Sequence, residues 1–246
     1  MKENEIFVHR IGNDPNSFMI TEQIIGTVKK KKNYRVSFEG LLETQEKVSA
    51  NQAITNPSVP RYIQIKGDWN PDATKEIHQA NLLGGTGTLT ISESKIEIPG
   101  NQATPELLSF YGATLFKIGD IFQFETNAEL PVTTMNIGET YVEHYLKLPN
   151  LGGGTYIEYH DRPHFHLPLD RSASGHLILG HFKSNEYILS AFMIPFGYGI
   201  YTPPELLHAD AYLIGRYMVV YSITEHFSTV LFKNKKNKLV DVTISK

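Results

Sequence analysis

Four of the chain's ten histidines lie in one short segment, HDRPHFHLPLDRSASGH (160–176). His164 and His166 are two residues apart, so on an extended strand both imidazoles point to the same face. Asp170 follows four residues after His166, and a bend at Pro168 would bring its carboxylate toward the same point. Such a set, open on one side, is what a catalytic metal ion needs, because water or substrate must occupy the remaining positions.

A second segment, GYGIYTPPELLHAD (197–210), contributes another candidate ligand. A strand that enters the rigid proline turn at 203–204 would place His208 at a defined position at the start of the next strand. An isolated HxH pair also occurs by chance, and histidines beside Asp161 and Asp170 can be ordinary surface residues. The two segments together favour a metal site more strongly than either does alone.

The order and spacing of these two segments resemble the paired motifs of the cupin superfamily. The first cupin motif is HxH followed by an acidic residue, here HFH (164–166) and then Asp170. The second runs from a glycine through a proline turn to a histidine, here Gly197 to His208. The chain departs from the pattern at Asp170, where glutamate is usual, and at Glu205, which replaces the turn glycine. The resemblance covers about residues 152–225.

The resemblance implies that His164, His166 and His208 bind a divalent transition metal, with Asp170 as a fourth ligand. The chain contains no cysteine, so thiolate ligands are excluded. A donor set of imidazole and carboxylate suits Fe, Mn, Ni or Zn, and the affinity order alone does not choose among them.

The segment TYIEYH (155–160) holds two further candidates for chemistry. Tyr156, Glu158 and His160 share one face of a strand, and that face is expected to line the barrel interior. Glu158 is the substitute for Asp170 as carboxylate ligand, and Glu158 or His160 near the metal would act as the general base. The alternative is that Glu158 and His160 pair with Arg162 on the rim.

The elements that must position these residues are mainly strands. Short runs that alternate apolar and polar residues predict antiparallel strands of a sandwich or barrel; they span 34–42, 61–69, 87–98, 115–126, 186–194 and 216–223. Two short helices are expected, at 73–83 and at 104–112, the second with Thr104 as its cap and Pro105 in its first turn.

The glycine-rich segment LPNLGGG (148–154) is a bend or linker, because three glycines do not suit a regular strand. It divides the chain into a β-rich N-terminal portion, 1–150, and a metal-binding cupin barrel, 151–246. The N-terminal portion either extends that barrel or forms a degenerate second cupin without metal. The extension is slightly favoured, because no second motif supports a complete second barrel.

The net charge and the distribution of apolar residues limit the classes of binding partner that we expect. The formal net charge is −3, which gives no electrostatic reason to expect nucleic acid or an anionic membrane. The N-terminal residues lack the apolar core of a signal peptide, and no apolar run approaches a membrane span, so a cytoplasmic protein is expected. A homodimer is expected because cupin barrels frequently pair.

Three hypotheses for function follow. The first is a metal-dependent cupin enzyme for a small polar metabolite, either a dioxygenase (an oxidoreductase) or a sugar isomerase or epimerase. The second is a non-catalytic cupin that binds or senses a small ligand. The third is an interaction protein whose functional surface lies in the N-terminal portion. The fold alone does not select a reaction.

Overall fold

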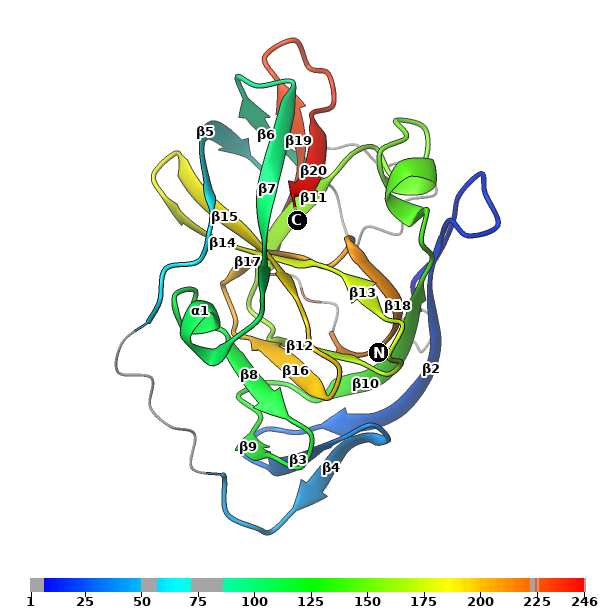
Figure 1. The fold of residues 1–246 in the computed structure, drawn as a ribbon, viewed down its shortest axis with the longest axis vertical. Coiled ribbons are helices and arrows are strands. Elements are labelled where there is room, and N and C mark those ends of the chain that lie inside the picture. The colour runs from blue at the N-terminus through cyan, green and yellow to red at the C-terminus, as the bar shows by residue number, and fades with distance from the viewer. Residues whose placement is uncertain (1–6, 50–56, 72–85, 222–223, 225, 246) are drawn as a thin grey trace.

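The computed structural model describes residues 7–49, 57–71, 86–221, 224 and 226–245. These described residues are mainly β, with 54% in strands and 5% in helices. Seven strands form a closed barrel, and further sheets are attached to it (Figure 1). The expectation of a mainly β chain with a barrel is therefore confirmed.

The barrel is a ring of hydrogen-bonded strands that closes where the first strand of the ring pairs with the last. In spatial order the ring contains β14 (Leu177–Lys183), β17 (Leu207–Ala209), β11 (Tyr156–His160), β19 (Phe227–Asn234), β6 (Gly87–Ile91), β5 (Ile63–Asn70) and β15 (Glu186–Met193). Adjacent strands of the ring are antiparallel to each other, except β19 and β6, which are parallel. Two parallel pairings then add β7 (Lys95–Gln102) and β20 (Asp241–Ser245) beside β15.

A second sheet of eight strands lies against the barrel and carries the HFH segment. Its strands are β1 (His9–Ile11), β2 (Phe18–Val28), β10 (Leu130–Ile137), β18 (Leu213–Val220), β12 (His164–Pro168), β16 (Tyr198–Thr202) and β8 (Thr114–Lys117), with β13 (Ser174–Gly175) paired to β18. A third, small sheet contains β4 (Gly40–Thr44), β3 (Asn33–Ser37) and β9 (Ile121–Gln123) and lies at the lower end of Figure 1.

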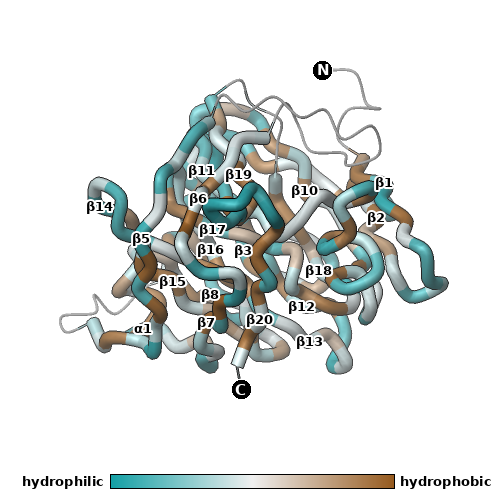
Figure 2. The backbone as a smooth tube through the Cα atoms, turned by 90° about the horizontal axis from the view of Figure 1, so that it is seen from above, coloured by the Kyte–Doolittle hydropathy of each residue, from teal (hydrophilic) through white to brown (hydrophobic). Residues whose placement is uncertain are grey.

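Both faces of β12 are buried, which explains its alternating sequence. Phe165 and Leu167 belong to a hydrophobic cluster that also takes residues from the small sheet, among them Tyr34 and Phe122. Successive side chains of a strand point to opposite faces, so the histidines on either side of Phe165 face the barrel instead. In Figure 2 apolar and polar segments alternate along many strands, and the turn between β14 and β15 is hydrophilic.

Helices are few and short. The helix predicted at 104–112 is present as α1 (Pro105–Ser109), and the Thr104 side chain accepts a hydrogen bond from the backbone N–H of Leu107, as expected for a cap. A single π-helical turn, η2 (Val142–Leu146), precedes the glycine-rich bend. The helix predicted at 73–83 lies outside the described residues. Within the described part of the chain, no helix has the length and apolar character that crossing a membrane requires.

Strands from before and after residue 150 share their sheets. β5 and β6 complete the barrel ring, while β10 pairs with β18 in the second sheet. The predicted runs 87–98 and 115–126 each cover parts of two strands joined by a turn. The predicted bend is present as irregular turn structure between residue 147 and residue 155, where Gly153 and Gly154 both have positive φ.

Candidate metal centre

Three strands bring the histidines together. Glu158 lies on β11 directly opposite His208 on β17, in the barrel wall. His160 lies at the end of β11, and His164 begins β12 in the second sheet after a short connection. The cluster therefore lies where the barrel wall and the second sheet face each other, and all of its imidazoles are buried.

Two groups of three side chains could each hold a metal ion, because the ligand atoms within each group lie within 4.8 Å of one another. The groups overlap, and His164 belongs to both. The first is the triad of His160, His164 and His208, and the second joins His164 to His166 and Asp210. Two nitrogens bound to one ion at about 2.1 Å lie no more than about 4.2 Å apart, so binding requires only small shifts of the rings. The buried triad is thus a candidate metal site.

His208 is held in the protonation state that a metal ligand needs. Its Nδ1 lies 2.8 Å from the carbonyl oxygen of Leu206, which can only accept, so Nδ1 carries the proton and Nε2 carries the lone pair. Burial lowers the pKa of His208 to about 4, which keeps the ring neutral at pH 7. Within the described residues Nε2 is buried and has no hydrogen-bond partner. A carbonyl bound to the far nitrogen is the usual outer contact of a metal-bound histidine.

His164 and His160 are also neutral. The pKa of His164 is well below its ordinary value because of burial and the three neighbouring histidines, and its Nδ1 is buried without a hydrogen-bond partner in the described chain. Burial and His208 lower the pKa of His160 to about 4. His160 Nδ1 accepts a 3.3 Å hydrogen bond from the backbone N–H of Arg162, so in this arrangement its Nε2 carries the proton.

His166 is paired differently. Its Nε2 lies 3.4 Å from Asp210 Oδ2, while Asp210 Oδ1 accepts a 2.8 Å hydrogen bond from the Tyr156 hydroxyl. Burial alone would raise the pKa of Asp210, but His166 and Tyr156 together hold it well below its ordinary value. Asp210 is therefore ionised, and His166 donates to it from Nε2. Nδ1 of His166 is buried without a partner among the described residues.

Glu158 is the carboxylate nearest the triad. Its Oε1 lies 3.8 Å from His208 Nε2, and its Oε2 accepts a 2.7 Å hydrogen bond from the Thr229 hydroxyl. Burial raises the pKa of Glu158, although His160 partly opposes the shift. A carboxylate with a raised pKa is a stronger base than an ordinary glutamate and is suited to proton transfer.

A cavity of about 80 Å³ opens beside the triad. It is lined by Val8, Arg10, Met19, Met135, Tyr156, Glu158, His160, His164, Asp210, Tyr221, Thr224, Phe227 and Thr229. The three β11 residues predicted to share an interior face are all in this lining. A water molecule needs at least roughly 10–15 Å³ of cavity, so the space suits a ligand of only several non-hydrogen atoms.

Asp170 lies outside both groups, and Asp210 is the carboxylate beside His164 and His166. Strand β12 ends at Pro168, and Asp170 belongs to a bend in which its carbonyl accepts from the Ala173 N–H. Asp210 was missed by sequence reasoning, although a signal existed. It follows His208 by two residues, the same spacing that linked His164 to His166.

The turn before His208 has left-handed backbone at its non-glycine residue. Glu205, where a glycine was expected, has φ of 64°, and Gly197 has φ of 86°. The backbone N–H of Glu205 donates to the carbonyl of His160 at 2.8 Å, which ties this turn to the end of β11. The Arg162 side chain contacts Asp161 and Asn127.

No family model, curated protein or solved structure matches this chain. The closed barrel with its buried histidine cluster is compatible with a cupin-like jelly roll.

Proposed function

We propose that this protein is a metal-dependent enzyme of cupin type that transfers a proton next to the carbonyl group of a small polar substrate. The observation that carries the proposal is the buried triad of His160, His164 and His208 beside a carboxylate, Glu158, whose pKa is raised. Three imidazoles and no thiolate suit Fe, Mn, Ni or Zn. When bound, the metal would polarise a carbonyl oxygen as a Lewis acid.

His208 would bind the ion through Nε2, which already carries its lone pair, and His164 through Nδ1, which has no hydrogen-bond partner among the described residues. His160 must give up its 3.3 Å contact with the Arg162 N–H to bind through either nitrogen. A hydrogen bond contributes about 1 kcal/mol, whereas a structural zinc site contributes about 10–16 kcal/mol in all. The loss of that contact is therefore small compared with the gain from coordination.

Glu158 would remove a proton from the hydroxyl-bearing carbon next to the carbonyl and return it to the carbonyl carbon, while the hydroxyl proton passes to the carbonyl oxygen. The Thr229 hydroxyl holds one carboxylate oxygen at 2.7 Å, so the other oxygen faces His208 and the triad. These proton-handling groups favour an isomerase over a dioxygenase. The cavity of about 80 Å³ favours short-chain carbonyl compounds over full sugar rings.

The metal is tested first. Protein purified without chelator is expected to contain a transition metal by elemental analysis, and His164→Ala to lose it, because His164 belongs to both candidate groups. His226→Ala, which removes an exposed histidine, is the matched control and should keep the metal. Wild-type protein without bound metal would contradict the proposal.

The reaction is tested with dihydroxyacetone in D₂O, with proton exchange followed by NMR. Glu158→Gln should keep the metal but lower the exchange rate by about 100-fold or more, in line with the loss of a general base. Glu129→Gln, at an exposed ion pair with Lys29, should leave the rate unchanged. If the protein instead consumes oxygen in a metal-dependent reaction, its activity is that of an oxygenase and not of an isomerase. Ligand binding without exchange or oxygen uptake would indicate a non-catalytic binding protein.

A further inference from the structure

Thr202 is a buried polar residue next to the histidine cluster. It ends β16, lies directly opposite His164 of β12 and is 1% exposed. Directly opposed residues of an antiparallel pair lie on the same face of the sheet, with their Cβ atoms about 4.5–5.5 Å apart. The Thr202 side chain is therefore a neighbour of the His164 imidazole.

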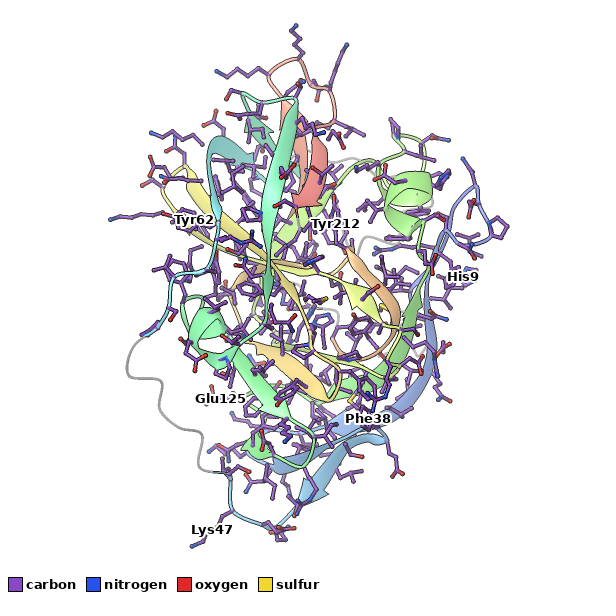
Figure 3. The ribbon with its side chains drawn as sticks, viewed as in Figure 1. His9, Phe38, Lys47, Tyr62, Glu125 and Tyr212 are labelled. Atoms are coloured by element: carbon purple, nitrogen blue, oxygen red, sulfur yellow. The ribbon has the colours of Figure 1, made fainter. Side chains whose placement is uncertain are left out.

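The preceding residue, Tyr201, shows which face this is. Its side chain belongs to the hydrophobic cluster under the small sheet, and its hydroxyl donates to the carbonyl of Glu125 at 3.0 Å. Glu125, two residues after the end of β9, is labelled in the lower half of Figure 3. Successive strand residues point to opposite faces, so Thr202 points toward the barrel, as His164 does.

The Thr202 hydroxyl has no hydrogen-bond partner among the described residues. The same holds for His164 Nδ1 and His208 Nε2, so neither nitrogen is bonded to this hydroxyl. Thr133 of the same sheet shows the ordinary case, because its hydroxyl donates to the Val219 carbonyl at 3.0 Å. Buried polar groups are nearly always paired, and leaving one unpaired is unfavourable. Buried polar atoms without partners at one place indicate a binding site for a polar ligand.

The proposed metal ion accounts for the two nitrogens but not for the hydroxyl, because the usual protein ligands of these metals are imidazole, carboxylate and thiolate. We propose that the Thr202 hydroxyl donates a hydrogen bond to the oxygen atom that completes the coordination of the ion. That oxygen belongs to water before substrate binds and to the substrate carbonyl afterwards. This inference rests on the proposed function, since it requires the ion.

Thr202 and Glu158 approach the triad from different walls. Glu158 lies on β11 of the barrel ring opposite His208, whereas Thr202 lies on β16 of the second sheet. The hydroxyl can therefore hold the carbonyl oxygen without competing with Glu158 for the proton on carbon. It would also stabilise the negative charge that develops on this oxygen when Glu158 removes that proton.

Fluoride binding to the cobalt(II) protein tests this hydrogen bond. Fluoride is a small ligand that accepts hydrogen bonds, and the visible absorption of cobalt(II) changes when its ligands change. Thr202→Val should weaken fluoride binding by about tenfold or more, because a hydrogen bond to a charged group is lost. Thr202→Ser keeps the hydroxyl and should bind fluoride nearly as the wild type does. Equal fluoride affinity in Thr202→Val, or a wild-type spectrum that does not respond to fluoride, would overturn the proposal.

The stability of the metal-free protein provides a second measurement. In EDTA, Thr202→Val should have a folded-to-unfolded ratio about fivefold or more above that of the wild type, because an unpaired buried hydroxyl is replaced by a methyl group. Urea unfolding measures this ratio. A less stable Thr202→Val protein would show that the hydroxyl is paired within the protein, which would also overturn the proposal.

Thr134→Val is the matched control. Its hydroxyl is likewise buried without a partner among the described residues. Thr134 lies opposite Met218, however, and Met218 belongs to the cluster under the small sheet and not to the metal centre. Thr134→Val should therefore gain stability as Thr202→Val does, but bind fluoride as the wild type does.

The outcomes separate this inference from the proposed function. Wild-type protein that binds no cobalt would contradict both. Bound cobalt with equal fluoride affinity in the wild type and in Thr202→Val would contradict only the role of Thr202.

Discussion

Each histidine of the cluster has a different set of partners, and these partners define what it can do. His208 has its proton fixed by the Leu206 carbonyl, and His166 has its proton fixed by Asp210. His160 accepts from a backbone N–H, while His164 stands between the two candidate ligand groups. The histidines of the cluster therefore differ in which ring nitrogen donates a proton and which one accepts a hydrogen bond or remains without a partner.

The first prediction separates the two candidate groups. His160→Ala should lower metal affinity by about 100-fold or more, because it removes a member of the proposed triad, whereas His166→Ala should lower it by about tenfold or less through the loss of an outer contact. Competition with a coloured chelator measures both affinities. The reverse order would place the ion between His164, His166 and Asp210 instead.

The second prediction concerns the two aspartates. Asp210→Asn should weaken metal binding by a few-fold, up to about tenfold, because it removes the ionised carboxylate that holds His166 beside His164. Asp170→Asn should leave the affinity unchanged, since Asp170 lies outside both groups. The same chelator competition applies. A loss of metal in Asp170→Asn and not in Asp210→Asn would restore the ligand set implied by the cupin motif.

At the scale of elements, β12 positions two of the histidines because both of its faces are buried. Phe165 packs into the cluster under the small sheet and thereby fixes the orientation of the residues on either side of it. On the adjacent strand β16, Gly199 lies against the Phe165 ring, and an added Cβ there would overlap that ring. The site thus depends on a close approach of two strands that only glycine allows.

The third prediction follows from this contact. Gly199→Ala should lower the free energy of unfolding by about 1–3 kcal/mol, as overpacking of a core typically does. It should also weaken metal binding, because the displaced ring moves β12. Gly26→Ala is the control, since its new Cβ would meet only Val132 at 4.0 Å. Urea unfolding measures the stability of the two variants, and chelator competition measures their metal affinity. A Gly199→Ala protein with unchanged stability would show that the Phe165 ring has room to move.

At the scale of the whole molecule, the two halves of the chain form common sheets. The barrel ring needs β5 and β6 from the N-terminal portion, and in the second sheet the C-terminal strands β18, β12 and β16 lie between β10 and β8 of the N-terminal portion. Long-range strand pairing of this kind leaves neither portion with a complete set of backbone hydrogen bonds on its own. The candidate metal centre therefore draws on strands from both portions, and Arg10 lines the same cavity as His160 and His164.

The fourth prediction is that residues 151–246 do not fold alone. Strands β11, β12, β15, β18 and β19 all lie in sheets that are completed by strands before residue 150. The isolated fragment would expose unpaired edges and is expected to aggregate or to remain unfolded. Circular dichroism and the dispersion of amide NMR signals test this. A monomeric fragment with a dispersed spectrum would show that the C-terminal portion is an independent domain.

The fifth prediction concerns pH. In the metal-free protein, His160 and His208 have pKa values of about 4, below the unfolded value of 6.5, so the unfolded chain binds more protons in this range. Stability should therefore fall as pH is lowered from about 7 to about 4, by on the order of 3 kcal/mol for each histidine. Glu158, with its raised pKa, opposes this trend, but the histidines outnumber it.

Urea unfolding in the presence of EDTA, at about pH 7 and about pH 5, measures this effect. His160→Gln removes one of the titrating groups and should show a smaller difference between the two conditions. Equal stability at both values would mean that the histidines are not held neutral by burial.

Several features of this protein followed from the sequence because they depend on neighbouring residues. The alternation in HFHL placed two imidazoles on one face, and Thr104 with Pro105 marked the start of α1. The absence of cysteine restricted the donor set to imidazole and carboxylate. These are consequences of strand and helix periodicity and of side-chain chemistry, which act over a few residues.

Only the tertiary structure decided which of these residues meet. Glu158 and His208 are 50 positions apart and become direct neighbours through the pairing of β11 with β17. Asp210 and not Asp170 lies beside His166, and Arg10 reaches the same cavity from the other end of the chain. Such contacts depend on which strands pair and in which register, and long-range pairing leaves no local pattern in the sequence.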